Sequence, residues 1–273
     1  MIRNTFIILE GIGNKLEKRL WREGILTWNH FLDSNHLTFI SPQRKGVFDR
    51  ILFSAYTELN EGNSTYFVNT LKRNEHWRLY DVFKGNAVCL DIETNGLPPE
   101  RGGYVTVVGM YDGNTYRCFI RGENLNVGAI NKELSKYKYL ITFYGSVFDL
   151  PFLKTCFRNL MIDIPHFDLC FGARRTGLKG GLKKLEQHFD IQREDKVNGM
   201  DGYDAVLLWQ EAEKGNSKAL DLLILYNKED TVNLFRIAES IYTRLKKLTG
   251  IEAYEKICYN DGRPRGGWTR DNC

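Results

Sequence analysis

The sequence has few of the features that mark secreted or membrane-bound proteins. Its six cysteines are scattered over 273 residues without a Cys-x-x-Cys pair, which is typical of small buried residues in a reducing compartment rather than of a disulfide framework. The N-terminal apolar run is too short for a secretion signal and ends at Glu10, and no stretch approaches the length of a membrane span. We therefore expect a cytoplasmic protein without membrane attachment.

The overall composition is that of an ordinary folded protein. Hydrophobic residues make up 42% and charged residues 26% of the chain, so disorder is not the default expectation. The formal charge of +4 is mildly basic, which is compatible with a polyanionic partner but does not identify one.

The hydrophobic pattern divides the chain into regions. Residues 1–85 show helical apolar spacing, with two short helices separated by Gly24, whereas the pattern from residue 86 onward is α/β. Asp112-Gly113 between two apolar runs predicts a hairpin, residues 126–138 predict a helix, and residues 217–248 predict a long one. We expect a mixed sheet covered by helices over 86–248, a helical region before it, and an extension with a flexible tail over 249–273.

Two acids at the end of the first predicted strand raise a question of charge. Asp91 and Glu93 in "AVCLDIETNG" are two residues apart and so share one face of the strand. Two like charges this close are unfavourable unless a cation lies between them or both reach water. Taken alone, the pair favours a solvated strand end over a metal site.

Further acids follow at the ends of later elements. Asp149 in "FYGSVFDLPFL" lies in the turn before a predicted helix, where a helix N-cap is the alternative role. Tyr226 and Asp230 in "LYNKEDTVNL" lie four residues apart on one helix face, where a solvated helix surface is the alternative.

The order of these motifs resembles the DEDD superfamily of exonucleases, in the variant with a catalytic tyrosine. The segments "GGLKKLEQHFDIQRE", "DGYDAVLLWQEAEKGN" and "ALDLLILYNKEDTVNL" are similar to the stand-alone ribonuclease H-like exonucleases of bacteria and archaea. The resemblance covers residues 86–245, and the N-terminal segment is similar to the helical extension of that family. It implies a ribonuclease H-like α/β fold with a mixed five-stranded sheet flanked by helices.

The resemblance also implies a site with two divalent ions. Asp91, Glu93, Asp149 and Asp230 would hold Mg²⁺ or Mn²⁺, for which hard oxygen ligands are suited. Tyr226 would orient the attacking water, because a tyrosine with an ordinary pKa of about 10 is a poor base. The histidine variant of the superfamily is not matched, since Leu225 stands at that position.

Several residues are candidates for contact with nucleic acid. Tyr144 stands where the superfamily usually has Asn, and its ring would either stack on a base or pack at a strand end. The segment from Phe171 to Lys184 is basic, which indicates either a phosphate-binding loop or a solvated face. Gly11-Ile12-Gly13 resembles a helix-hairpin-helix motif, with or without retained binding. The candidate contacts are Gly11, Gly13, Thr94, Asn95, Tyr144, Arg174, Arg175, Lys179 and Lys183. His166 and Asp168 in "PHFDL" could face the groove, but we expect them to open a helix, with Asp168 serving its first turn.

The expected function is therefore a metal-dependent 3′–5′ exonuclease. Its expected partner is DNA or RNA, as a single-stranded 3′ end. A structure-specific endonuclease with the same metal site and a non-catalytic nucleic-acid-binding protein are the alternatives.

Overall fold

The computed structural model describes residues 1–260, and the expected flexible tail lies outside the described residues. The strands are β1 (Ala87–Thr94), β2 (Val105–Tyr111), β3 (Tyr116–Ile120), β4 (Tyr139–Thr142) and β5 (His166–Asp168). The α-helices of the described part are α1 (Asn14–Arg22), α2 (Trp28–Asp33), α3 (Pro42–Asn60), α4 (Tyr66–Thr70), α5 (Tyr80–Phe83), α6 (Val127–Leu134), α7 (Asp149–Cys156), α8 (Leu169–Arg175), α9 (Leu182–His188), α10 (Gly202–Glu213), α11 (Ser217–Thr249) and α12 (Ile251–Asn260). None of the described helices is both long enough and apolar enough to cross a membrane.

The five strands form one mixed sheet in the order β3-β2-β1-β4-β5. β1 pairs antiparallel with β2 and parallel with β4, and β5 continues the parallel half. The predicted hairpin joins β2 to β3, and the Asp112 carboxylate closes its turn by accepting hydrogen bonds from the backbone N–H groups of Asn114 and Thr115. The mixed five-stranded sheet flanked by helices is confirmed.

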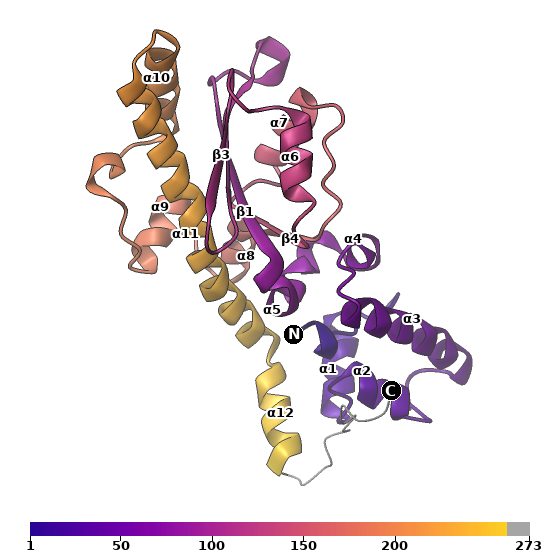
Figure 1. The fold of residues 1–273 in the computed structure, drawn as a ribbon. Helices are drawn as coiled ribbons and strands as arrows, with labels where there is room; N and C mark the ends of the chain where they lie inside the picture. Colours follow the sequence, from indigo (N-terminus) through magenta and orange to yellow (C-terminus); the bar gives the residue numbers. More distant parts are fainter. Residues whose placement is uncertain (261–273) are drawn as a thin grey trace.

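Helices cover both faces of the sheet (Figure 1). On one face, α6 and α7 pack against the even-numbered residues of β1, which include Val88, Leu90 and Ile92. On the other face lies α11, whose apolar residues share a core with Ala87 and Cys89. The alternation of the strand therefore places the next odd-numbered residues, Asp91 and Glu93, on the side of α11.

The helix α11 approaches β2 very closely at one glycine. A Cβ atom on Gly109 would lie 1.9 Å from Asn227 Oδ1 and 2.7 Å from Thr231 Oγ1. Gly109 is also paired with Asp91 across the β1–β2 ladder. A residue without a side chain is thus required for α11 to lie this near to the acids of β1.

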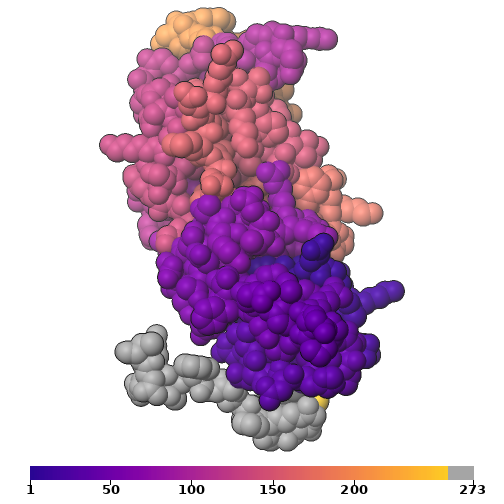
Figure 2. Space-filling view, turned by 90° about the vertical axis from the view of Figure 1, so that its right-hand side faces the viewer, coloured from indigo at the N-terminus to yellow at the C-terminus, as the bar shows by residue number. Residues whose placement is uncertain are grey.

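The N-terminal helices pack against α11 rather than standing apart. Buried side chains from Met1 to Phe83 belong to the same hydrophobic core as Leu234, Ile237 and Ile241 of α11. Figure 2 shows the N-terminal part lying directly against the part that follows it in sequence. Within the N-terminal part, the buried Arg78 pairs with Glu17 of α1 at 3.2 Å and with Glu75 at 2.7 Å. The division of the chain at residues 85 and 248 stays a prediction.

Replacing Gly109 by alanine tests the close approach of α11. We expect Gly109→Ala to lower the free energy of unfolding by about 1–3 kcal/mol, because the added methyl group overlaps Asn227. Chemical denaturation measures this loss. Gly85→Ala is the control, because a Cβ atom at Gly85 meets nothing within 4 Å; equal stability of the two variants would contradict the packing described here.

Candidate metal centre

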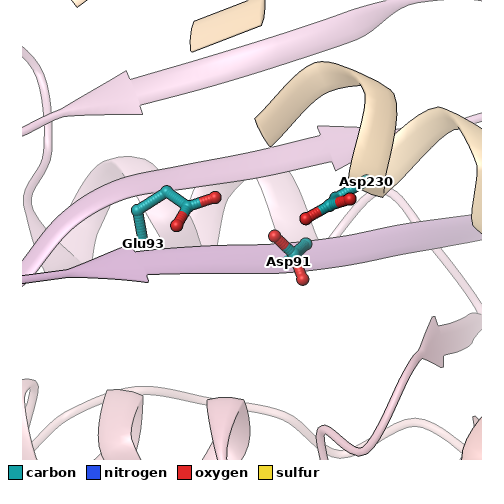
Figure 3. A group of neighbouring side chains, drawn as sticks. All are labelled: Asp91, Glu93 and Asp230. Atoms are coloured by element: carbon teal, nitrogen blue, oxygen red, sulfur yellow. The ribbon is translucent and has the colours of Figure 1, made fainter. Parts of the chain in front are cut away.

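Three carboxylates meet where β1 passes α11. Asp91 and Glu93 of β1 and Asp230 of α11 each offer one oxygen atom, and these atoms all lie within 4.8 Å of one another. Figure 3 shows Asp91 and Glu93 on one face of the strand, with Asp230 reaching toward them from the helix. Glu93 and Asp230 are buried, and Asp91 is partly exposed. Three oxygen ligands at this separation are a donor set that suits Mg²⁺ or Mn²⁺.

Asp149 lies beside this group and is tied to the same strand. It is the first residue of α7, where Phe148 holds the N-cap position, so the alternative role as an N-cap is wrong. Its Oδ1 atom instead accepts a hydrogen bond from the backbone N–H of Ile92 at 3.2 Å. Because Ile92 stands between Asp91 and Glu93, this bond fixes the fourth carboxylate next to the other three.

Tyr226 lies one helical turn before Asp230 on α11 and shares a cavity with the acids. The cavity has a volume of about 240 Å³, and its lining includes Asp91, Glu93, Asp149, Tyr226 and Asp230. The structure thus brings together the five residues that the sequence motifs single out. Tyr226 is buried, so the alternative of a solvated helix surface is wrong for it.

The carboxyl groups hold their protons more tightly than free acids do. Burial, and then the charge of the neighbouring acids, raises the pKa of Asp91 and Glu93 well above their usual values. Burial likewise raises the pKa of Asp149 to about 7 and that of Asp230 above its usual range. Burial next to these acids also raises the pKa of Tyr226, so its hydroxyl stays protonated at neutral pH. A divalent cation would relieve the repulsion among the acids.

Arg193 is the cation that this structure places among the acids. Its guanidinium pairs with Asp230, and its Nε atom lies 2.7 Å from Glu186. The same guanidinium lies 5.8 Å from the centre of the Tyr226 ring. The roles of Arg193 and Glu186 are not predicted by the sequence, because one arginine in a loop and one glutamate on a helix carry no local signal of pairing.

Asn227 connects the acids to the helix α11, and it is not among the site residues predicted from the sequence. Its Nδ2 atom donates to Asp91 Oδ2 at 3.0 Å and lies 3.3 Å from Glu93 Oε1, while its Oδ1 atom accepts from the Tyr116 hydroxyl at 2.8 Å. The side chain is fully buried. A signal was available, because Asn227 is a polar residue within the apolar stripe of α11 and Gly109 interrupts an apolar strand.

An exposed pair of aromatic rings borders the cavity. Tyr144 lines it and stacks on Phe171, with ring centres 6.1 Å apart. The Arg174 guanidinium lies over both rings, 6.0 and 5.4 Å from their centres. Tyr144 has a left-handed backbone, with φ of 63°, and its N–H donates to Asp168 at 2.9 Å. This backbone conformation holds the Tyr144 ring at the surface, where it is 40% exposed.

The other candidate nucleic-acid contacts differ in whether they lie at the cavity of the acids. Thr94 lines the cavity, and Lys183 Nζ lies 5.8 Å from the centre of the Tyr226 ring. Asn95 holds the loop after β1 by accepting a hydrogen bond from Tyr104 N–H. Arg175 is engaged by the protein itself, since it donates to the Asn74 carbonyl and pairs with Glu75. Lys179 is exposed.

The two glycines of the N-terminal hairpin lie at the surface, far along the chain from the acids. Gly11 has a φ of 77° and Gly13 precedes α1. A guanidinium nitrogen of Arg44 occupies the space beside Gly11 and donates to the Glu10 carbonyl at 2.9 Å. Nucleic-acid binding by this hairpin stays a prediction.

Asp168 caps α8, as expected. Its side chain accepts hydrogen bonds from Cys170 N–H in the helix and from Tyr144 and Ser146 N–H in the loop after β4. His166 lies in β5, two residues before the helix cap, and is buried. The expectation that they open a helix is therefore confirmed for Asp168 and wrong for His166, which belongs to the strand before the helix.

Comparison with known proteins identifies the family. A model of the RNase_H superfamily matches residues 88–242, more than half of the chain. The chain belongs to the RNase_H superfamily.

Two solved structures show similarity to this RNase H-like chain. One, described as the apo form of the nuclease, is 19% identical, covers 67% of this chain and 90% of its own, and gives a TM-score of 0.45. NrnC of Brucella melitensis is 18% identical, covers 70% of this chain and 94% of its own, and gives a TM-score of 0.40. Comparison with curated proteins finds no match.

Membership in the RNase_H superfamily supports a nuclease that acts on nucleic acid. It also agrees with a divalent-metal site at the acidic group of Asp91, Glu93 and Asp230.

Removing the amide of Asn227 should weaken metal binding. We expect Asn227→Leu to lower Mn²⁺ affinity by roughly 10- to 100-fold, because Asp91 and Glu93 lose the donor that orients them. Calorimetric titration measures this affinity. Lys228→Leu places the same side chain at the exposed neighbouring position, and an unchanged affinity in Asn227→Leu would show that Asn227 does not orient the ligands.

Stability of the metal-free protein should fall as the pH rises. The pKa of Asp149 is about 7 in the folded chain against 3.8 for an ordinary aspartate, so the folded state binds more protons between these values. In the presence of chelator, we expect wild type to lose about 3 kcal/mol relative to Asp149→Asn between pH 4 and 7. Denaturation across this pH range checks the difference; parallel stability curves would exclude a raised pKa.

Proposed function

We propose that this protein is a 3′–5′ exonuclease of the tyrosine-containing DEDD type that acts on single-stranded DNA or RNA. The observation that carries the proposal is the convergence of Asp91, Glu93, Asp149, Asp230 and Tyr226 on one cavity. The 3′–5′ direction rests on the resemblance of these motifs to that superfamily.

The donor set fits two divalent ions. Asp91, Glu93 and Asp230 would share the first ion, because their oxygen atoms lie together. Asp149 would serve the second ion together with Asp91. Bound Mg²⁺ or Mn²⁺ would lower the pKa of an attacking water and neutralise charge on the leaving oxygen.

The protein side chains would position the reactants around this centre. The Tyr226 hydroxyl would act as a hydrogen-bond donor that orients the water or a phosphate oxygen, because burial beside the acids raises its pKa and disfavours the ionised form that a base requires. Asn227 holds Asp91 and Glu93 in place. Arg193 lies close enough to Asp230 to balance the charge of the acids before a metal binds.

The terminal nucleotides of the strand would lie along the exposed aromatic pair. Tyr144 offers a ring face at the border of the cavity, and bases stack on such rings without sequence preference. Arg174 lies over the Tyr144 ring and Lys183 near the Tyr226 ring, so both would add positive charge at the border of the cavity. Single-stranded substrates fit this arrangement best, because their bases are free to stack.

Cleavage of end-labelled substrates tests the proposal. We expect wild type with Mn²⁺ to shorten a 5′-labelled single strand stepwise, and Asp91→Asn to reduce the rate at least about 100-fold because Asp91 would contact both ions. Product ladders on gels measure both rates. Equal residual activity of wild type and Asp91→Asn would show that the assignment of Asp91 to the catalytic site is wrong. Cleavage of a circular single strand would show that the protein is an endonuclease.

Replacing Tyr226 separates water orientation from metal binding. We expect Tyr226→Phe to slow turnover by about 10- to 1,000-fold while Mn²⁺ affinity stays unchanged, because only the hydroxyl donor is lost. Single-turnover kinetics and calorimetry measure the two properties. Lost Mn²⁺ affinity would show that Tyr226 is a metal ligand instead.

A further inference from the structure

A second cavity lies beside the metal centre, at the junction between the N-terminal helices and the sheet. Its volume is about 370 Å³, which is within the range of small-molecule sites. The aromatic rings of Trp77, Phe167 and Phe171 contribute to its walls, and Arg73 and Asn74 come from the N-terminal part. Both Arg73 and Asn74 are exposed, so the cavity is open to the surface on that side.

The cavity contains a buried polar group without a partner. His166 lines it and is 95% buried, since only 5% of its surface is exposed. Its Nε2 atom lies 2.8 Å from Thr142 Oγ1, and its Nδ1 atom has no hydrogen-bond partner among the described residues. The Nδ1 atom exposes less than 1 Å² of surface, so it is enclosed in the cavity wall and not open to a ligand. Phe171, which is 39% exposed, offers its ring to a flat aromatic ligand in the cavity.

The second cavity shares a wall with the metal centre. Phe171 lines the second cavity and stacks on Tyr144, which lines the first one. The Arg174 guanidinium lies over both rings. Ser146 and Asp168, which hold the backbone of the Tyr144 loop, also line the second cavity. A strand held at the acids would reach this cavity by crossing the stacked rings.

We propose that the second cavity binds an unpaired nucleobase of the strand whose end lies at the metal centre. The exposed Phe171 ring would stack on the base, and Arg73 at the opening would contact the adjoining phosphate. The proposal rests on the proposed function for the presence of that strand. It differs from the proposed function in naming a base-binding site outside the acidic cavity.

Filling the opening tests the proposal. Asn74→Trp adds a ring at the cavity, and the Asn74 carbonyl that accepts the hydrogen bond from Arg175 is kept because it belongs to the backbone. Asn69→Trp is the matched control, since Asn69 is exposed on α4 and does not line the cavity. Arg73→Ala is a second variant, which removes the predicted phosphate contact without adding bulk.

Binding is measured by fluorescence anisotropy with a labelled single-stranded oligonucleotide. All variants carry Asp91→Asn, so the comparison does not depend on cleavage. We expect Asn74→Trp to raise the Kd about tenfold, as the loss of one stacked base implies. Arg73→Ala should raise it about threefold and weaken its salt dependence, and Asn69→Trp should leave it unchanged.

The outcomes distinguish a base of the bound strand from a free nucleotide, and they test the base-binding site separately from the exonuclease activity. Unchanged oligonucleotide affinity in both Asn74→Trp and Arg73→Ala would overturn the base-binding site. Calorimetric titration with adenosine monophosphate tests whether a free nucleotide occupies the cavity instead. If Asn74→Trp loses adenosine monophosphate binding while its oligonucleotide affinity is unchanged, the cavity binds a free nucleotide, and its assignment to the strand is overturned. A tenfold loss of oligonucleotide affinity in Asn74→Trp would support the site even if wild type cleaves nothing, in which case only the exonuclease proposal fails.

Discussion

Repulsion among four closely spaced carboxyl groups, three of them buried, governs how the elements around the metal centre are arranged. Asp91 and Glu93 point from β1 toward α11, where Asp230 meets them, and Asp149 approaches the same strand from α7. Burial raises the pKa of each of these acids, so the site costs free energy wherever it is ionised without a cation. Binding of divalent ions would offset this cost, which couples metal binding to the stability of the fold.

The surrounding elements hold the acids together despite that repulsion. Gly109 lets α11 approach the sheet, and the approach brings Asn227 within hydrogen-bonding distance of Asp91 and Glu93. Arg193 supplies a positive charge that Glu186 orients. These contacts stabilise the ligands in one arrangement before a metal binds, which lowers the entropy that binding must overcome.

Much of the fold and the acidic site could be predicted from the sequence. The alternation of "AVCLDIE" places Asp91 and Glu93 on one face, and helical spacing places Tyr226 beside Asp230. The hydrogen bond from Ile92 to Asp149 could not be predicted, because it joins residues 57 positions apart through a backbone group. Arg193 and Glu186 were missed for the same reason, since the geometry of a loop decides which side chains pair. The cavity of His166 and Trp77 depends on how the N-terminal helices pack on the sheet, and no local pattern records that packing.

Crystals soaked with Mn²⁺ test the central claim most directly, because anomalous scattering locates the ions. We expect two peaks among the oxygen atoms of Asp91, Glu93, Asp149 and Asp230, and an Arg193 guanidinium that has moved away from Asp230. Absence of any peak among these oxygen atoms at saturating Mn²⁺, with Arg193 still paired to Asp230, would contradict a metal centre at these acids.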